Sequence, residues 1–278
     1  MDEVTFLEYL SYPFVRNALV AGVLISLCAA LLGVPLVLRR LSFMGDWLSH
    51  VAFGAMAVAG VLNFADTMAL SLPVTIAAAL VLMRSGRGAK TGGDAMLAML
   101  SVGAMAAGYL VMNLKPSTSN VSGDVCTTLF GSVSILTLTT LDMWLSVGLS
   151  VAVCVLWLFA YNRVFDMTFD ESYARASGAN TTLFNTLAAV VVAVVIVISM
   201  RLVGTLLVSS LLVVPAIAAM RVAKSFRAVC VVAAVFTVVC SLAGIMIAVV
   251  AGTPVGSTIV AADIISFFFM AIIGRFLK

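Results

Sequence analysis

Long apolar segments recur along the whole chain, separated by short polar stretches. They fall at about 17–38, 47–62, 65–83, 95–113, 141–161, 183–200, 203–220, 228–250 and 255–274. Most of them approach or exceed the roughly 20 residues that an α-helix needs to cross the hydrocarbon core of a membrane. The pattern predicts an all-α, polytopic membrane protein with about nine transmembrane segments. Because these segments fill the sequence, we expect one transmembrane domain over 1–278.

Two of the segments are irregular. Segment 47–62 is barely long enough to span and contains Gly54 and Gly60, and 183–220 forms two short halves separated by Arg201. In polytopic transporters such segments often lie in the protein interior beside a pathway, where freed backbone groups find partners. Close helix packing explains them equally well. Residues 114–140 are too polar for a full span, and we expect an outer loop with a short re-entrant or interfacial helix there.

The charges of the chain indicate its orientation. Only 10% of the residues are charged, against roughly 25% in soluble domains. If the N-terminus lies outside, twelve of the 15 basic residues fall on the inner side, and such an excess marks the cytoplasmic loops. We therefore predict an outer N-terminus and an inner C-terminus. The inner residues are Arg39, Arg40, Arg84, Arg87, Lys90, Arg163, Arg175, Arg221, Lys224, Arg227, Arg275 and Lys278, and the outer ones are Arg16, Lys115 and Arg201.

One short stretch, "MGDWLSH" (44–50), combines an aspartate with the only histidine of the chain. Asp46 and His50 are four residues apart, which places both side chains on one face of a helix, roughly 6 Å apart along its axis. An aspartate inside a bilayer costs on the order of 2.5 to 3.5 kcal/mol, so it is a candidate functional residue. Carboxylate and imidazole together suit first-row divalent metals such as Mn, Zn and Fe. We therefore predict that Asp46 and His50 are metal ligands.

A structural role for the same two residues is also open. Asp46 could cap the helix that it begins, because aspartate is a favoured N-cap residue. His50 could hydrogen-bond to a neighbouring backbone group or serine. If the pair does bind metal, two ligands are too few, and two copies of the chain related by a two-fold axis would supply four.

The long inner connection 162–181 contains a second candidate feature. Asp170 is placed to cap a short helix that has Glu171 in its first turn, and Gly178 is placed to end it. A helix of about eight residues is not stable alone in water, so it should lie against the protein, the membrane surface or a partner. A solvated connector is the alternative. The other residues assigned to this helix are Ser172, Tyr173, Ala174 and Arg175.

Catalytic motifs are missing from the sequence. There is no phosphate-binding loop of the type Gly-x-x-x-x-Gly-Lys-Ser/Thr, so any ATP must be handled by another chain. An intramembrane aspartyl protease needs two aspartates on facing helices, and only "GGD" at 92–94 comes near one of them. The five cysteines form no Cys-x-x-Cys pair and are interpreted as small apolar side chains. We predict no enzyme activity, no resident cofactor and no nucleic-acid partner.

Several motifs resemble one known family. "RRLSFMGDWLSH" (39–50) is similar to a signature of the membrane permease subunits of bacterial ABC importers for zinc, manganese and iron. Further similarity lies in "FDESYARASG" (169–178), "VGTLLVSSLLVVPAIAA" (203–219) and "GTPVGSTIV" (252–260). The resemblance runs from about residue 15 to 275.

The resemblance implies a type II ABC importer-like permease in the bacterial plasma (inner) membrane. It implies a homodimer, each copy docked on a cytoplasmic ATP-binding cassette subunit, with an extracytoplasmic metal-binding protein delivering the ion. It also implies that Asp46 and His50 line the translocation path and that 170–178 is the coupling helix seated on the ATPase. A secondary divalent-cation transporter or channel without an ATPase is the alternative function.

Overall fold

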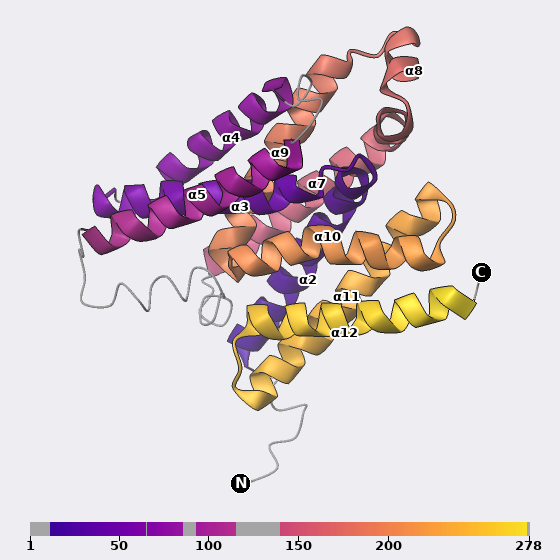
Figure 1. Cartoon of the computed structure of the whole chain (residues 1–278). Helices are drawn as coiled ribbons and strands as arrows, with labels where there is room; N and C mark the ends of the chain where they lie inside the picture. The colour runs from indigo at the N-terminus through magenta and orange to yellow at the C-terminus, as the bar shows by residue number, and fades with distance from the viewer. Residues whose placement is uncertain (1–11, 65, 86–92, 115–139, 277–278) are drawn as a thin grey trace.

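The computed structural model describes residues 12–64, 66–85, 93–114 and 140–276, and throughout these ranges the ordered elements are α-helices, without a β-strand. The all-α prediction is therefore confirmed for the described part of the chain (Figure 1). The helices are α2 (Pro13–Leu38), α3 (Ser42–Val61), α4 (Met68–Ser85), α5 (Gly93–Leu114), α7 (Thr140–Phe169), α8 (Glu171–Ala176), α9 (Thr181–Val203), α10 (Thr205–Val222), α11 (Phe226–Ala251) and α12 (Val255–Phe276).

Seven of the described helices are long and apolar enough to cross a membrane, namely α2, α5, α7, α9, α10, α11 and α12. In α4 the apolar part is shorter, from Met68 to Met83. The helix α3 has 20 residues but carries Asp46 and His50. All nine predicted apolar segments coincide with helices, while nine actual crossings and the orientation of the termini stay predictions.

The helices differ in how far their neighbours cover them. In α2, α9 and α10, 50% of the most apolar 18-residue stretch is buried inside the protein. In α5 and α12 the buried share of this stretch is only 17%. Figure 1 shows α3 and α10 side by side, with α4 and α5 beyond α3 and with α11 and α12 beyond α10. The central helices therefore form the core, and the outer helices expose the apolar surface expected of a protein that faces lipid.

The polar connection before α8 is shorter than the sequence predicted. The apolar pattern ends near 161, yet α7 continues to Phe169. Its last two turns mix polar with apolar residues, and Phe165 and Phe169 pack on Phe226, so the helix continues with an apolar face. The backbone becomes extended only at Asp170, which is the N-cap of α8.

The break between the halves of 183–220 also lies elsewhere than predicted. The helix α9 continues through Arg201 to Val203, and the chain turns at Gly204 instead. Gly204 has a φ of 96° and a ψ of 158°, a conformation that favours glycine because it has no Cβ. The glycine rather than the arginine separates α9 from α10. The predicted outer loop and re-entrant helix fall on 115–139, which lie outside the described residues, and α7 begins at Thr140.

Close packing explains one of the two glycines that made segment 47–62 irregular. A Cβ on Gly108 of α5 would lie 2.9 Å from the Cα of Gly54, and a Cβ on Gly54 would lie 3.0 Å from the carbonyl oxygen of Ala104. The two helices therefore touch through their backbones, as small residues allow in membrane proteins. Gly60, in contrast, has open space around its Cβ position. For Gly54 the packing interpretation is the one that the structure supports.

We expect Gly108→Leu to force α3 and α5 apart, because its side chain has no room beside Gly54 and Phe53. Overpacking of this kind costs ~1–3 kcal/mol. The thermal unfolding midpoint of the purified protein in detergent should fall. Gly103→Leu is the matched control, since this glycine of the same helix is exposed and has open space at its Cβ position. Equal midpoints for the two variants would contradict the contact.

Candidate functional site

Asp46 and His50 lie in the second and third turns of α3 rather than at its start. The helix begins at Ser42, and its N-cap is Leu41, which makes no side-chain capping bond. Asp46 is thus in the second turn, where it cannot act as the N-cap. The capping alternative for Asp46 is therefore wrong. The helical spacing does place both side chains on one face, with Nδ1 of His50 3.8 Å from Oδ2 of Asp46.

A serine from a second helix joins the two residues. Ser101 of α5 donates its hydroxyl to Oδ2 of Asp46 at 2.8 Å, and its Oγ lies 2.7 Å from Nδ1 of His50. Three polar side chains from two helices thus converge on one point. The alternative that His50 bonds to a serine is correct in itself, but the same serine also holds the carboxylate of Asp46.

The hydrogen bonds determine which nitrogen of His50 is free. The Ser101 hydroxyl has one proton, and it is donated to Asp46. The bond between Ser101 and His50 must therefore use a proton on Nδ1. In a neutral His50 the lone pair then belongs to Nε2. Metal-binding histidines commonly hydrogen-bond through one ring nitrogen and coordinate through the other, and this arrangement leaves Nε2 for a metal.

The three side chains are unequally exposed. Ser101 is buried, the side chain of His50 is 13% exposed, and that of Asp46 is 38% exposed. The hydroxyl is enclosed between α3 and α5 while part of the carboxylate remains accessible. An ion or a further ligand can therefore approach Asp46 from the open side without displacing Ser101.

The donor set of this site is incomplete for a transition metal. Nowhere in the described part of the chain do three or more His, Cys, Asp or Glu side chains come together closely enough to hold a metal ion. The site offers a carboxylate, an imidazole and a hydroxyl, whereas tetrahedral or octahedral ions need four or six donors. Water or a second protein chain must supply the remainder.

The short helix predicted after Asp170 is present as α8. Asp170 Oδ1 accepts the backbone N–H of Tyr173 at 2.9 Å, so it is the expected N-cap. Glu171 lies in the first turn and pairs with Arg175 at 3.5 Å. Gly178 has a φ of 88°, which suits its place just after the helix. Of the assigned residues, Ala174 is buried, while Ser172, Tyr173 and Arg175 are exposed.

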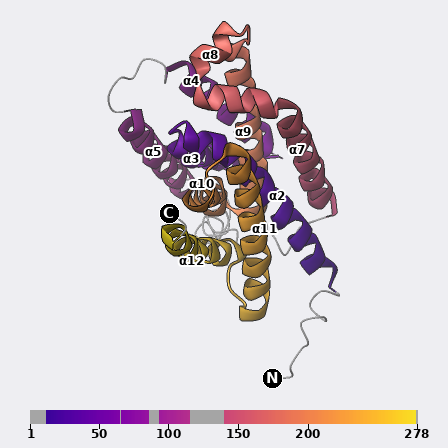
Figure 2. The same ribbon diagram turned by 90° about the vertical axis from the view of Figure 1, so that its right-hand side faces the viewer.

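The helix α8 is attached to the bundle by polar contacts that the sequence did not reveal. Arg39, directly after α2, places Nη2 3.3 Å from Oε2 of Glu171. Its Nη1 donates to Oδ1 of Asn185 on α9 at 2.8 Å. The solvated-connector alternative is therefore wrong for Glu171 and Ala174, which face the protein. In both Figure 1 and Figure 2, α8 lies at an end of the bundle.

The structure adds Ser101, Arg39 and Asn185 to the residues predicted from the sequence. Ser101 is the only serine or threonine of α5, and a lone hydroxyl in an apolar helix is the one signal that could have drawn attention to it. Its distance of 51 residues from His50 cannot be bridged by helical spacing. Arg39 was assigned to the inner side by its charge alone.

The helices and their apolar surfaces define a multi-pass membrane protein, and comparison with known proteins identifies its family. The family model described as "ABC 3 transport family" matches residues 11–274 of this chain. The chain therefore belongs to the ABC 3 transport family, and the resemblance found in its sequence is confirmed.

Named relatives agree with this assignment. The chain is 30% identical over 244 residues to a "Probable metal transport system membrane protein" of Treponema pallidum, covering 85% of this chain and 86% of that one. It is 26% identical over 270 residues to the manganese import system permease protein ScaB of Streptococcus gordonii, covering 96% and 95%. The solved structure of PsaBC from Streptococcus pneumoniae in complex with Fab superposes with a TM-score of 0.82 at 25% identity, covering 95% and 94%. A multi-pass bacterial membrane protein is the class that these matches support.

We expect Ser101→Ala to destabilise the protein, because it leaves Nδ1 of His50, whose side chain is only 13% exposed, without its hydroxyl acceptor. Leaving buried polar groups unsatisfied costs ~1–3 kcal/mol, which a lower thermal midpoint in detergent would report. Ser49→Ala is the control, since that equally buried hydroxyl bonds to a carbonyl of its own helix, at Asp46. If the two variants unfold at the same temperature, Ser101 does not hold the site together.

Proposed function

We propose that this protein is the permease subunit of an ATP-driven importer of a divalent transition-metal ion, with Asp46 and His50 as ligands on the translocation path. The observation that carries the proposal is the convergence of Asp46, His50 and Ser101 between two helices of a bundle whose core is mainly apolar. Polar groups inside a membrane protein are costly and mark ion pathways more often than structure. The names of the relatives support the same substrate class.

Manganese is the first candidate for the transported ion, followed by zinc and iron. The accessible carboxylate of Asp46 supplies oxygen donors, and carboxylate oxygens suit manganese well. A single imidazole is accepted by all three metals. The ScaB relative is named as a manganese import protein, which favours the same choice. The ion is the substrate of the protein and not a resident cofactor.

A homodimer would complete the ligand set. Two chains related by a two-fold axis would bring two carboxylates and two imidazoles to one path, and symmetric dimers are the commonest assembly. The partly exposed carboxylate of Asp46 supports this arrangement, because it leaves one side of the site open to a further donor. Incomplete or shared coordination would also keep binding weak enough for release to the inside.

The proposed energy source is a separate ATP-binding cassette subunit docked on α8. This helix is capped at Asp170, anchored through Glu171 and exposed through Tyr173, so it offers a firm surface to a partner. Figure 1 shows α8, the α10–α11 connection and the end of α12 toward the same side, which fits an inner face rich in basic residues. The proposed orientation has the N-terminus outside and the C-terminus inside, with nine crossings. An extracytoplasmic metal-binding protein would deliver the ion to the outer mouth.

A secondary cation transporter or channel remains the competing function. It would share the helices and the Asp46–His50 site but would need no ATPase. The capped and anchored α8 favours the ATP-driven importer, because a carrier without a cytoplasmic partner has no evident use for this exposed helix. Two measurements distinguish these functions: whether metal uptake requires ATP, and whether the protein copurifies with an ATPase.

We expect Asp46→Ala and His50→Ala to lower the cellular content of one metal, because each removes a ligand from the path. Mass spectrometry of whole cells that depend on this system should show a loss of at least tenfold in system-dependent uptake of that metal. Manganese, zinc and iron are measured together, so the experiment also identifies the substrate. Copurification with the ATPase establishes that each variant still assembles.

Asp66→Asn provides the control for this experiment. It removes a carboxylate from the α3–α4 connection but keeps an oxygen that can accept the N–H of Met68, as Asp66 does at 3.0 Å. Its metal content should match that of the unchanged protein. Normal content of all three metals in assembled Asp46→Ala and His50→Ala variants would reject both residues as ligands.

A further inference from the structure

Three side chains join α8 to the turn between α2 and α3. Arg39 comes from the end of α2, Glu171 from the first turn of α8, and Asn185 from the second turn of α9. Arg39 contacts both of the others, at 3.3 Å and 2.8 Å, and Asn185 Nδ2 lies 3.5 Å from Oε1 of Glu171. Each residue therefore touches the other two, and we refer to Arg39, Glu171 and Asn185 as the inner triad.

The inner triad differs from an ordinary surface ion pair. Asn185 is buried, and the side chains of Arg39 and Glu171 are only 20% and 32% exposed. An exposed pair of long side chains is held weakly, because water competes and both side chains lose freedom. Here a buried amide fixes the guanidinium and the carboxylate in one geometry. The contact can therefore carry a displacement from one helix to another.

The inner triad is also close to the candidate metal site along the chain. Only Arg40 and Leu41 separate Arg39 from the first residue of α3, and Arg40 adopts a φ of 58°. The turn is closed by backbone hydrogen bonds, including one from Leu41 N to the carbonyl of Leu36 at 2.8 Å. Asp46 follows about 6 Å further along the axis of α3, at 1.5 Å per residue. A short and closed turn thus connects Arg39 to the helix that carries both metal ligands.

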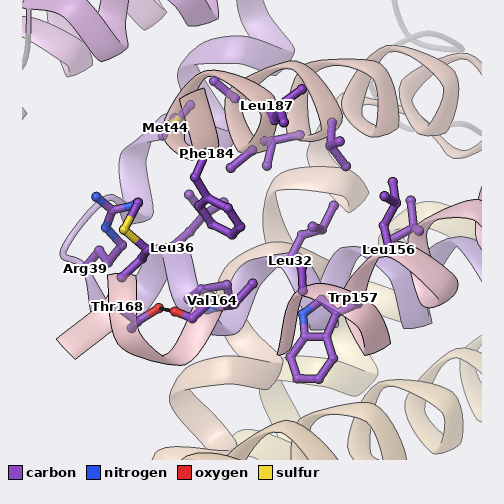
Figure 3. Close-up of a pocket in the computed structure, with 18 of the residues that line it drawn as sticks. Leu32, Leu36, Arg39, Met44, Leu156, Trp157, Val164, Thr168, Phe184 and Leu187 are labelled. Carbon is purple, nitrogen blue, oxygen red and sulfur yellow. Dashed lines mark hydrogen bonds between the residues drawn. The ribbon is translucent and has the colours of Figure 1, made fainter. Parts of the chain in front are cut away.

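A cavity beside the inner triad gives these elements room to move. Its volume is about 190 Å³, and it lies between α2, α7 and α9 with almost entirely apolar walls. Figure 3 shows Arg39 and Phe184 at one end and Leu32 and Trp157 further along. Tightly packed interiors resist displacement, whereas an unfilled space permits one helix to shift against another. A small shift of α2 against α7 and α9 would therefore meet less packing resistance here than in the filled core.

We infer that the inner triad is the link through which movement of α8 reaches Asp46 and His50, so that Arg39 is a positioning residue for the metal site. This inference rests on the proposed function, in which an ATPase acts on α8. When α8 moves, Glu171 displaces Arg39, and the closed turn passes the displacement to the start of α3. The ligands then change their position relative to Ser101, which belongs to α5.

The test is a charge exchange across the contact between Arg39 and Glu171. The assembled complex, with its ATPase and binding protein, is reconstituted in liposomes and supplied with Mn²⁺, and in parallel with Zn²⁺ and Fe²⁺. ATP hydrolysis and metal uptake are measured together. Arg39→Glu should keep hydrolysis within about twofold while lowering the metal taken up per ATP hydrolysed at least tenfold, and Glu171→Arg should lower the same ratio at least tenfold. The double variant Arg39→Glu with Glu171→Arg should recover at least half of the original ratio.

Arg40→Glu is the matched control, because it makes the same charge change one residue away. Its side chain is exposed and makes no hydrogen bond or ion pair to any described residue. In this variant the amount of metal taken up per ATP hydrolysed should stay at its original value. Binding of Mn²⁺ without ATP should stay within about twofold in every variant, since Asp46, His50 and Ser101 are intact. Milder variants, Arg39→Gln and Glu171→Gln, serve if a charge reversal prevents assembly, and each should lower the ratio at least threefold.

The outcomes separate this inference from the proposed function. If the unchanged complex takes up none of the three metals with ATP, the proposed function is wrong and the inference falls with it. If the unchanged complex transports metal and the variants keep its ratio of metal to ATP, the inference alone is overturned. A lasting loss in the double variant would also overturn it, because the contact itself would then not be what matters.

Discussion

The close contact between α3 and α5 is the constraint on which the site depends. Asp46 and His50 belong to one helix and Ser101 to the other, so their hydrogen bonds exist only while the two backbones stay near each other. Gly54 and Gly108 permit that approach because neither carries a side chain. Small residues thus take the place that large apolar side chains have in soluble cores, since in a membrane packing rather than exclusion from water holds helices together.

The helix α3 connects the Asp46–His50 site both to α5 and to the turn before α3. Toward α5 the helix meets the Ser101 hydroxyl that bonds to Asp46 and His50, and it begins just after the turn that contains Arg39. One helix therefore joins the proposed metal ligands to the contact between Arg39 and α8. The proposed function thereby gives a role to an arginine, an aspartate and a histidine that lie within twelve positions of a chain with few charged residues.

The sequence predicted the parts of this arrangement that depend on local spacing. The helical segments follow from runs of apolar residues, the pairing of Asp46 with His50 from the four-residue interval, and α8 from Asp170 and Gly178 at its ends. Contacts between distant segments could not be predicted in this way. Ser101, and the bonds of Arg39 to Glu171 and Asn185, depend on how helices pack, which no single-helix pattern contains. The break at Gly204 was missed because the charge of Arg201 was a stronger signal than a lone glycine.

The most direct test of the account uses the fact that His50 is the only histidine of the chain. The purified protein is prepared with ¹⁵N-labelled histidine and loaded with Mn²⁺, and pulsed electron paramagnetic resonance detects the nitrogen nuclei bound to the metal. The account predicts a ¹⁵N coupling of a directly bound imidazole, absent in His50→Gln. Bound Mn²⁺ without any ¹⁵N coupling would contradict the claim that His50 is a ligand on the translocation path.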